Sequence, residues 1–180
     1  RKYFGKPIAP DKLLPVFEKI IRYFEDNGYP FAALSLDSVR IAGDSVHAQL
    51  RLDKGPMIKI DTVVINEEVN IAHHYLTQYL GIREGSPYNE SRIKAIDTRI
   101  RELTFLQSMA PWRMDFTSTQ NKLNLYLKPR SANRADVLVG LHPSTQETGG
   151  KFLLNGGVIL DFSNALGQGE SLQLNWQNLQ

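Results

Sequence analysis

The sequence predicts an α+β chain: two small modules of helices and antiparallel strands, followed by antiparallel strands of the kind that form transmembrane β-barrels. Two apolar stripes at helical spacing, each followed by a pair of strand-like segments, predict the modules. Alternation over 152–162 and 171–178 predicts the strands, because most apolar residues share one parity and polar residues such as Asn155, Asp161 and Gln173 fall on the other. A sheet that covers a soluble core on one face would alternate in the same way, so these two segments alone leave both arrangements open.

The composition is that of a folded protein with an uneven charge distribution. The chain has 180 residues, a net charge of +2 and no cysteine, which excludes disulfides and thiol catalysis. The residues after Arg134 include one lysine and four carboxylates, so this end of the chain has few basic residues and a net negative charge. The part before it has a net positive charge. No apolar run approaches the length of a transmembrane helix, and no targeting pattern opens the chain. We therefore expect that a signal was removed or that the chain is an excised piece.

The first module begins with a helix over 11–27. Gly28 ends this helix because glycine readily adopts the left-handed conformation found after helices, and Pro30 prevents its continuation. Two strands, 34–41 and 45–52, follow as a hairpin across Ala42, Gly43 and Asp44. The apolar helical stripe consists of Leu13, Leu14, Phe17, Ile20, Ile21 and Phe24.

The second module repeats this order and adds two elements before it. A strand over 58–65 leads into a short helix over 69–80, for which Asn66 or Asn70 is the expected cap. Asn89 is the expected cap of a long helix, which is followed by strands over 112–117 and 123–127. The long helix is predicted from the stripe Ile93, Ile96, Ile100 and Leu103. The order strand, helix, helix, strand, strand is complete here, and its last three elements form the first module.

The end of the chain, after a polar linker over 130–134, predicts three strands. The first is 136–142, and a polar turn over 143–150 separates it from the alternating segments. The turn 163–169 carries two glycines and an asparagine, as a tight reversal requires. In the barrel arrangement the membrane-facing side chains are Phe152, Leu154, Val158, Leu160, Phe162, Leu172, Leu174 and Trp176.

Four motifs in this order resemble the BamA/TamA-like outer-membrane assembly factor superfamily. They are the run 27–32 after the first helix, Lys54-Gly55-Pro56 before the 58–65 strand, the run 85–89 before the long helix, and 162–170 as a first barrel hairpin. The resemblance implies two polypeptide-transport-associated (POTRA) domains of β-α-α-β-β order in tandem, followed by an incomplete barrel. It places these domains at 1–56 and 57–130, and the barrel start at 131–180.

The sequence departs from the family pattern at both ends. The strand and short helix expected at the start of the first POTRA domain are not visible in 1–10, so this domain is expected to be cut at its N-terminus. About three barrel strands are present, whereas a closed membrane barrel needs about eight. We expect that the chain cannot form a pore by itself.

Motifs that suggest catalysis or ligand binding have simpler explanations in this sequence. Gly43-Asp44-Ser45 is expected to be a hairpin turn. It sits between two short strands, and the sequence gives no histidine and aspartate context that would complete a catalytic triad with Ser45. His73 and His74 are adjacent rather than four apart, so they are expected to be surface residues and not zinc ligands. Glu67 and Glu68 are expected in a solvated turn. No nucleotide-binding loop is present, and the basic residues Arg92, Lys94, Arg99 and Arg101 are expected to form a solvated helix face. We expect no enzyme activity, no cofactor, no metal and no nucleic-acid partner.

The resemblance implies a protein that receives other β-rich chains. A small sheet with an open edge can accept an extended strand through main-chain hydrogen bonds, with little demand on sequence. By resemblance, the strand-accepting edges are Leu34, Leu36, Ser38 and Arg40 in the first domain, and Trp112, Arg113, Met114, Asp115 and Phe116 in the second. The implied barrel seam, which can open toward client strands, is Asp136, Val137, Val139 and Leu141.

The implied location is the outer membrane of a Gram-negative bacterium, with the POTRA part in the periplasm. The implied partners are unfolded outer-membrane or secreted β-rich proteins, periplasmic or lipoprotein accessory subunits, and outer-membrane lipid. Two alternatives stay open at this point. The chain could be the non-catalytic POTRA and barrel anchor of a patatin-like phospholipase, or part of a two-partner secretion transporter.

Overall fold

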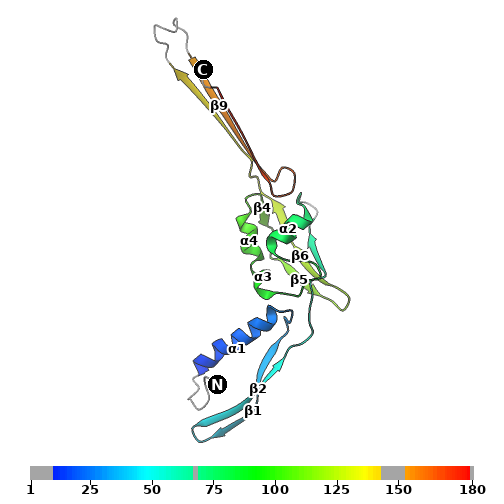
Figure 1. Ribbon diagram of the computed structural model, residues 1–180. Coiled ribbons are helices and arrows are strands. Elements are labelled where there is room, and N and C mark those ends of the chain that lie inside the picture. Colours follow the sequence, from blue (N-terminus) through cyan, green and yellow to red (C-terminus); the bar gives the residue numbers. More distant parts are fainter. Residues whose placement is uncertain (1–9, 67–68, 143–152, 179–180) are drawn as a thin grey trace. The chain divides into compact units, whose positions relative to one another are not determined.

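The computed structural model describes residues 10–66, 69–142 and 153–178 (Figure 1). The chain divides into two compact units, which are described separately. The first unit contains Arg1–Val64, Leu80–Ile96 and Trp112–Asn124, and the second contains Ile65–Tyr79, Asp97–Pro111 and Leu125–Gln180. None of the helices in the described ranges is long and apolar enough to cross a membrane.

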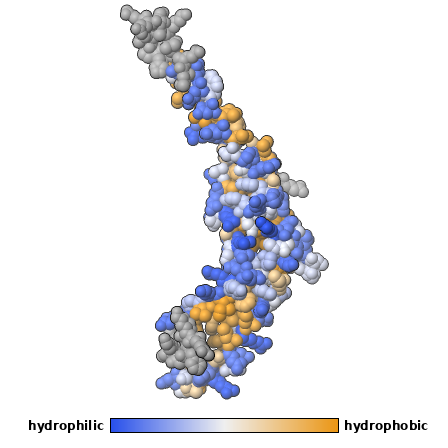
Figure 2. All heavy atoms as spheres, in the orientation of Figure 1, coloured by the Kyte–Doolittle hydropathy of each residue, from blue (hydrophilic) through white to orange (hydrophobic). Residues whose placement is uncertain are grey.

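Helix α1 (Pro10–Glu25) and the hairpin of β1 (Ala33–Ala42) and β2 (Ser45–Asp53) open the first unit, which confirms the predicted order. Apolar side chains gather between α1 and this hairpin (Figure 2), as the helical stripe requires. Gly28 has a φ of +95°, and a Cβ there would lie 3.3 Å from both Met57 Cγ and Pro87 Cβ. Glycine is needed at this position for its backbone conformation and for the space.

Strand β1 contains a bulge that the sequence pattern did not predict. Asp37 pairs with Gln49 but Arg40 pairs with His47, so two residues of β1 lie opposite one residue of β2. Ser38 has a φ of +51°, and its amide donates to Asp37 Oδ1 at 2.7 Å. The extra residue shifts the parity of the strand. As a result Ile41 comes to the same face as Leu34 and Leu36.

A three-stranded sheet has the order β3-β6-β5, with β3 (Thr62–Ile65), β5 (Arg113–Phe116) and β6 (Asn121–Leu125). The predicted strand over 58–65 is shorter than expected because its first half binds loops. The amide of Ile58 donates to Gly28 O at 2.7 Å, and the amide of Ile60 donates to Ser86 O at 2.9 Å.

The two predicted helices of this part form three helical segments: α2 (His73–Leu80), α3 (Glu90–Lys94) and α4 (Ile96–Glu102). Asn89 caps α3 as predicted, and its Oδ1 accepts the amide of Arg92 at 2.9 Å. The long helix is interrupted at Ala95, which caps α3. The predicted stripe is nevertheless buried: the exposed fractions are 0% for Ile93, 1% for Ile96, 0% for Ile100 and 7% for Leu103.

In the second unit β4 (Leu106–Ser108) pairs with β7 (Leu127–Pro129), a sheet that the sequence did not predict. The predicted strand over 123–127 is divided between β6 and β7. Asn66, one of the two expected helix caps, has another role. Its Nδ2 donates to Leu127 O and its Oδ1 accepts the amide of Leu127, both at 2.7 Å, so its side chain pairs with β7 in place of a backbone group.

The predicted three strands at the end of the chain are confirmed. They are β8 (Arg134–His142), β9 (Leu153–Ser163) and β10 (Ser171–Asn178), with β9 in the centre. Both pairs are antiparallel, and Val158 lies opposite Val137 on one side and Trp176 on the other.

Candidate strand-binding edge and apolar strand face

Strand β5 lies at the edge of its sheet. On one side it pairs with β6, from Arg113 opposite Asn124 to Phe116 opposite Asn121. Among the described residues no strand pairs with its other side. The edge predicted from the sequence is therefore an edge in the structure, and an extended chain can hydrogen-bond to such an edge.

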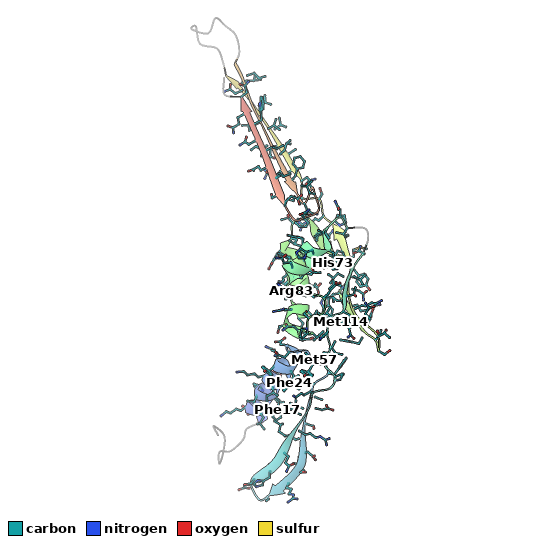
Figure 3. All side chains as sticks on the ribbon, turned by 45° about the vertical axis from the view of Figure 1, so that its right-hand side comes forward. Phe17, Phe24, Met57, His73, Arg83 and Met114 are labelled. Atoms are coloured by element: carbon teal, nitrogen blue, oxygen red, sulfur yellow. The ribbon has the colours of Figure 1, made fainter. Side chains whose placement is uncertain are left out.

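A cavity of about 570 Å³ adjoins β5 and the turn that follows it. Met114 and Asp115 are neighbours in a strand, so their side chains point to opposite faces, yet both line the cavity. The lining also includes the turn residues and Lys122 of β6, so the cavity lies at the turn end of the β5–β6 hairpin. Figure 3 labels Met114 on this hairpin. The complete lining is Met114, Asp115, Phe116, Thr117, Thr119, Gln120 and Lys122.

The side chains of β5 alternate less sharply than the sequence predicts. Trp112 and Met114 are only half-buried, and Phe116 is 41% exposed although its ring packs edge-on against Phe31, with 4.9 Å between ring centroids. Asp115, expected to face solvent, is also half-buried. Its carboxylate accepts Asn124 Nδ2 at 2.8 Å and forms an ion pair with Arg113 at 2.9 Å.

The second predicted edge, along β1, is interrupted. Leu34, Leu36 and Arg40 belong to regularly paired stretches, but Ser38 lies in the bulge between Asp37 and Arg40. A bulge disturbs the regular spacing of main-chain groups along a strand. This edge therefore offers an added strand two short stretches, Ala33–Asp37 and Arg40–Ala42.

One face of β8, β9 and β10 is apolar across all three strands. Residues opposite each other in paired strands share a face. Leu172 lies opposite Phe162, Leu174 opposite Leu160, and Trp176 opposite Val158. The same face contains Ala135, Val137, Val139, Leu141 and Leu154. Leu174 and Trp176 are 59% and 60% exposed. Phe152, predicted for this face, lies outside the described residues.

The opposite face of these strands is mainly polar. Ser171, Gln173, Asn175 and Gln177 project from it on β10. Asp136, a predicted seam residue, also belongs to this face and forms an ion pair with Arg134 at 2.7 Å. The other three seam residues, Val137, Val139 and Leu141, are on the apolar face.

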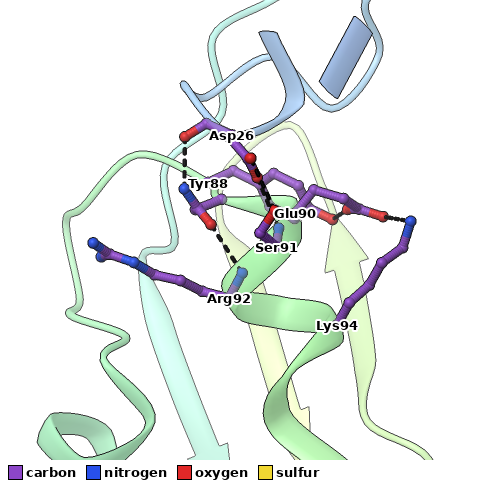
Figure 4. A network of polar contacts seen from close by, with 7 residues as sticks. Asp26, Tyr88, Glu90, Ser91, Arg92 and Lys94 are labelled. Carbon is purple, nitrogen blue, oxygen red and sulfur yellow. Dashed lines mark hydrogen bonds and ion pairs between the residues drawn. The ribbon is translucent and has the colours of Figure 1, made fainter. Parts of the chain in front are cut away.

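A polar network within the first unit joins the end of α1 to the start of α3 (Figure 4). The carboxylate of Asp26 accepts the amide of Ser91 at 2.8 Å and its hydroxyl at 2.9 Å. The backbone oxygen of Asp26 accepts Asn89 Nδ2 at 2.8 Å. Asp26 thus binds an amide at the start of a helix, where a negative charge is favourable. No local sequence pattern predicts this contact between residues 65 positions apart.

Tyr88 and Glu90 extend the network. The phenol of Tyr88, which is 4% exposed, donates to Glu90 Oε2. Burial raises the pKa of Tyr88, and the hydrogen bond to the Glu90 carboxylate raises it further because both favour the neutral phenol. The other oxygen of Glu90 forms an ion pair with Lys94 at 2.8 Å, so Glu90 links the Tyr88 phenol to the Lys94 ammonium group.

Replacing Asp26 with alanine is expected to lower the free energy of unfolding by about 1–3 kcal/mol, because two hydrogen bonds to a charged acceptor are lost and a helix-terminal amide is left without its partner. Denaturant titration of the full chain measures the change. Asp44→Ala, in an exposed hairpin turn, is the matched control and should change stability by less than about 0.5 kcal/mol. Equal effects of the two substitutions would contradict a stabilising role for Asp26.

The motifs that suggested catalysis or metal binding lie where the sequence placed them. Ser45 pairs with Ala42 at the end of the β1–β2 hairpin, which confirms a turn. His73 and His74 are exposed in the first turn of α2. Within the described ranges no group of three or more histidine, aspartate or glutamate side chains could hold a metal ion. Glu67 and Glu68 lie outside those ranges.

The described helices and antiparallel sheets make an α+β chain, as predicted. The crystal structure of BamA from Haemophilus ducreyi lacking POTRA domains 1–3 is similar over 97% of this chain and 32% of that chain, with a TM-score of 0.64 and 19% sequence identity. This chain therefore spans about a third of the crystallised BamA chain. At this identity the likeness is one of fold, and the resemblance predicted from the sequence is confirmed as a resemblance in fold to BamA.

Two other solved structures are similar with lower scores. POTRA3–5 of Haemophilus influenzae BamA has a TM-score of 0.46 and 15% identity, covering 70% of this chain and 52% of that one. CdiB from Acinetobacter baumannii has a TM-score of 0.48 and 13% identity, covering 96% and 31%. No family model and no curated protein sequence matches the chain.

Proposed function

We propose that this chain is the client-binding arm and the barrel entrance of an outer-membrane protein assembly or translocation factor. The observation that carries the proposal is the similarity in fold to the BamA crystal structure, an alignment that covers 97% of the chain. In this proposal residues 1–56 and 57–130 are POTRA domains in the periplasm, and residues 131–180 begin a barrel in the outer membrane. The apolar face of β8–β10 contacts lipid.

The proposed mechanism is strand addition at β5. An extended segment of an unfolded β-rich client forms main-chain hydrogen bonds with the outer side of Arg113–Phe116. Main-chain bonding is independent of the client's sequence, which suits a protein that handles many clients. The cavity beside Met114 and Asp115 gives room for one client side chain at this edge.

A proline at position 115 tests strand addition. Asp115→Pro removes a backbone donor of the edge strand and restricts its backbone. We expect crosslinking from a photoreactive residue at position 117 to an unfolded outer-membrane barrel protein to fall to background, in the full-length protein in membrane vesicles. Thr117 suits this purpose because it is exposed and lines the cavity.

Asp115→Asn is the matched control, because it removes the charge of the Arg113 ion pair but keeps the backbone amide. It should crosslink as well as the parent protein. Circular dichroism establishes whether each variant is folded. A folded proline variant that crosslinks to the client as well as the parent protein would exclude strand addition at β5. If crosslinking fell equally in the proline and asparagine variants, the client would be bound by the carboxylate of Asp115 instead.

A further inference from the structure

The turn between β9 and β10 has a fixed shape of its own. Asn164 has a φ of +58°, and its backbone N–H donates to Glu170 O at 2.7 Å. Its side-chain Oδ1 accepts the backbone N–H of Gly169 at 2.8 Å. The carboxylate of Glu170 accepts the amides of Leu166 and of Gln168, the latter at 3.0 Å. These amides lower the pKa of Glu170, the amide of Leu166 most. The turn is therefore held by its own side chains.

This turn contacts the segment that leads into α2, and both belong to the second unit. Asn164 Nδ2 donates to Asn70 O at 3.0 Å, and Gly167 O accepts the amide of Ala72 at 2.6 Å. Helix α2 begins at His73, and the first amides of a helix have no acceptor within it. The turn thus supplies an acceptor next to the start of α2.

Two glycines allow this close approach. Gly169 has a φ of +73°, and a Cβ there would lie 2.0 Å from Tyr75 Cζ, far inside any permitted contact. Gly167 is buried, has a φ of +81°, and its Cβ would lie 3.0 Å from Asn70 Oδ1. Both positions need glycine for the backbone conformation and also for the space that the facing residue fills.

We propose that the β9–β10 turn is a docking element that fixes the start of α2 to the end of the β9–β10 hairpin, with Asn164 and Gly169 as its positioning residues. The two segments bond through backbone and side-chain groups from both sides, and each glycine accommodates a different residue of the partner segment. The docking does not depend on strand addition at β5, so either can be wrong without the other.

The contacts continue from the docked segment toward α4. The ring of Tyr75 stacks on Tyr79 with 6.2 Å between centroids and 15° between planes. Tyr79 donates its hydroxyl to Arg99 O at 3.2 Å, and Arg99 Nη1 donates to Tyr79 O at 2.9 Å. A displacement of the turn would therefore reach α4 through packed rings and hydrogen bonds.

Hydrogen exchange at the amide of Ala72 tests the docking in the full chain in lipid nanodiscs. Gly169→Ala is expected to increase this exchange by about tenfold or more, because the added methyl group displaces Tyr75 and opens the segment locally. Gly85→Ala is the matched control, since Gly85 has a φ of +78° but nothing within 4 Å of an added Cβ. It carries the same backbone strain without the clash, and should leave Ala72 protected.

Asn164→Asp provides a second variant that leaves the turn intact. Aspartate keeps the oxygen that accepts the amide of Gly169 but loses the NH₂ group that donates to Asn70. Exchange at Ala72 should rise while exchange at Gly169 stays unchanged. In addition, when Tyr75→Ala is combined with Gly169→Ala, the clash is removed. The double variant should then exchange at Ala72 no faster than Gly85→Ala. Unchanged protection of Ala72 in both Gly169→Ala and Asn164→Asp would overturn the proposal, as would an equal rise in Gly85→Ala.

Discussion

In the proposed barrel, replacing Leu174 with arginine should lower the free energy of unfolding in lipid vesicles by about 2–4 kcal/mol, the cost of a cationic side chain on the lipid face near the middle of a strand. Leu174 lies mid-strand in β10, is 59% exposed, and shares its face with Leu160 and Trp176. Such an exposed apolar stripe is costly in water and favourable in lipid. Denaturant titration of the vesicle-inserted protein, followed by tryptophan fluorescence, measures the change.

Gln173→Arg is the matched control because it places the same side chain one residue away, on the polar face. It should change stability by less than about 1 kcal/mol. The comparison also decides between a membrane barrel and a sheet over a soluble core. If the apolar face covered an aqueous core, the chain without lipid would be monomeric with Leu174 buried, and lipid would not affect the cost of the arginine.

Replacing Ile93 with alanine should destabilise the chain by about 2–5 kcal/mol, because the methyl groups removed leave a cavity that the surroundings fill only in part. Ile93 is 0% exposed and lies in α3, two residues after Ser91, which binds Asp26. Thermal or denaturant unfolding of the full chain measures the loss. Ile93→Val, which removes one carbon, should cost about 0.5–1.5 kcal/mol.

Ile41→Ala removes the same atoms from a side chain that is 78% exposed in β1. Its effect should stay within about 0.5 kcal/mol. If Ile93→Ala lowered the free energy of unfolding as little as Ile41→Ala does, the prediction would be wrong. In that case α3 would not be part of the core.

Periodic patterns in the sequence predicted the helical stripes and the longer strands, but not the short β4–β7 sheet. The stripe from Ile93 to Leu103 predicted buried helix, and the alternation from Leu154 to Trp176 predicted one apolar face across β9 and β10. In both cases one face must be buried, so the spacing of apolar residues follows the geometry of the element. Glycine and asparagine signals were equally reliable at Gly28 and Asn89.

Features that depend on tertiary contacts could not be predicted. Ala95 interrupts a helix although alanine is the best helix former, so packing overrides local preference there. Ser38 adopts a positive φ without being glycine, and no local signal marks it. Asp26 contacts Ser91 across 65 positions, and Gly169 needs to be glycine because of Tyr75. The sequence did indicate a tight turn at Gly167 and Gly169, since both lie within 163–169, but it did not indicate which residue would face them.

The bulge in β1 also bears on self-association. An edge that accepts any extended strand can equally accept the same edge of a second copy, and such pairing can repeat into polymers. Two copies of β1 cannot form an unbroken ladder, because Ser38 and Val39 displace the main-chain groups between Asp37 and Arg40. The longest regular stretch available to a second copy is Ala33–Asp37. The bulge thus keeps a strand with exposed Val39 and Ile41 from becoming a template for aggregation.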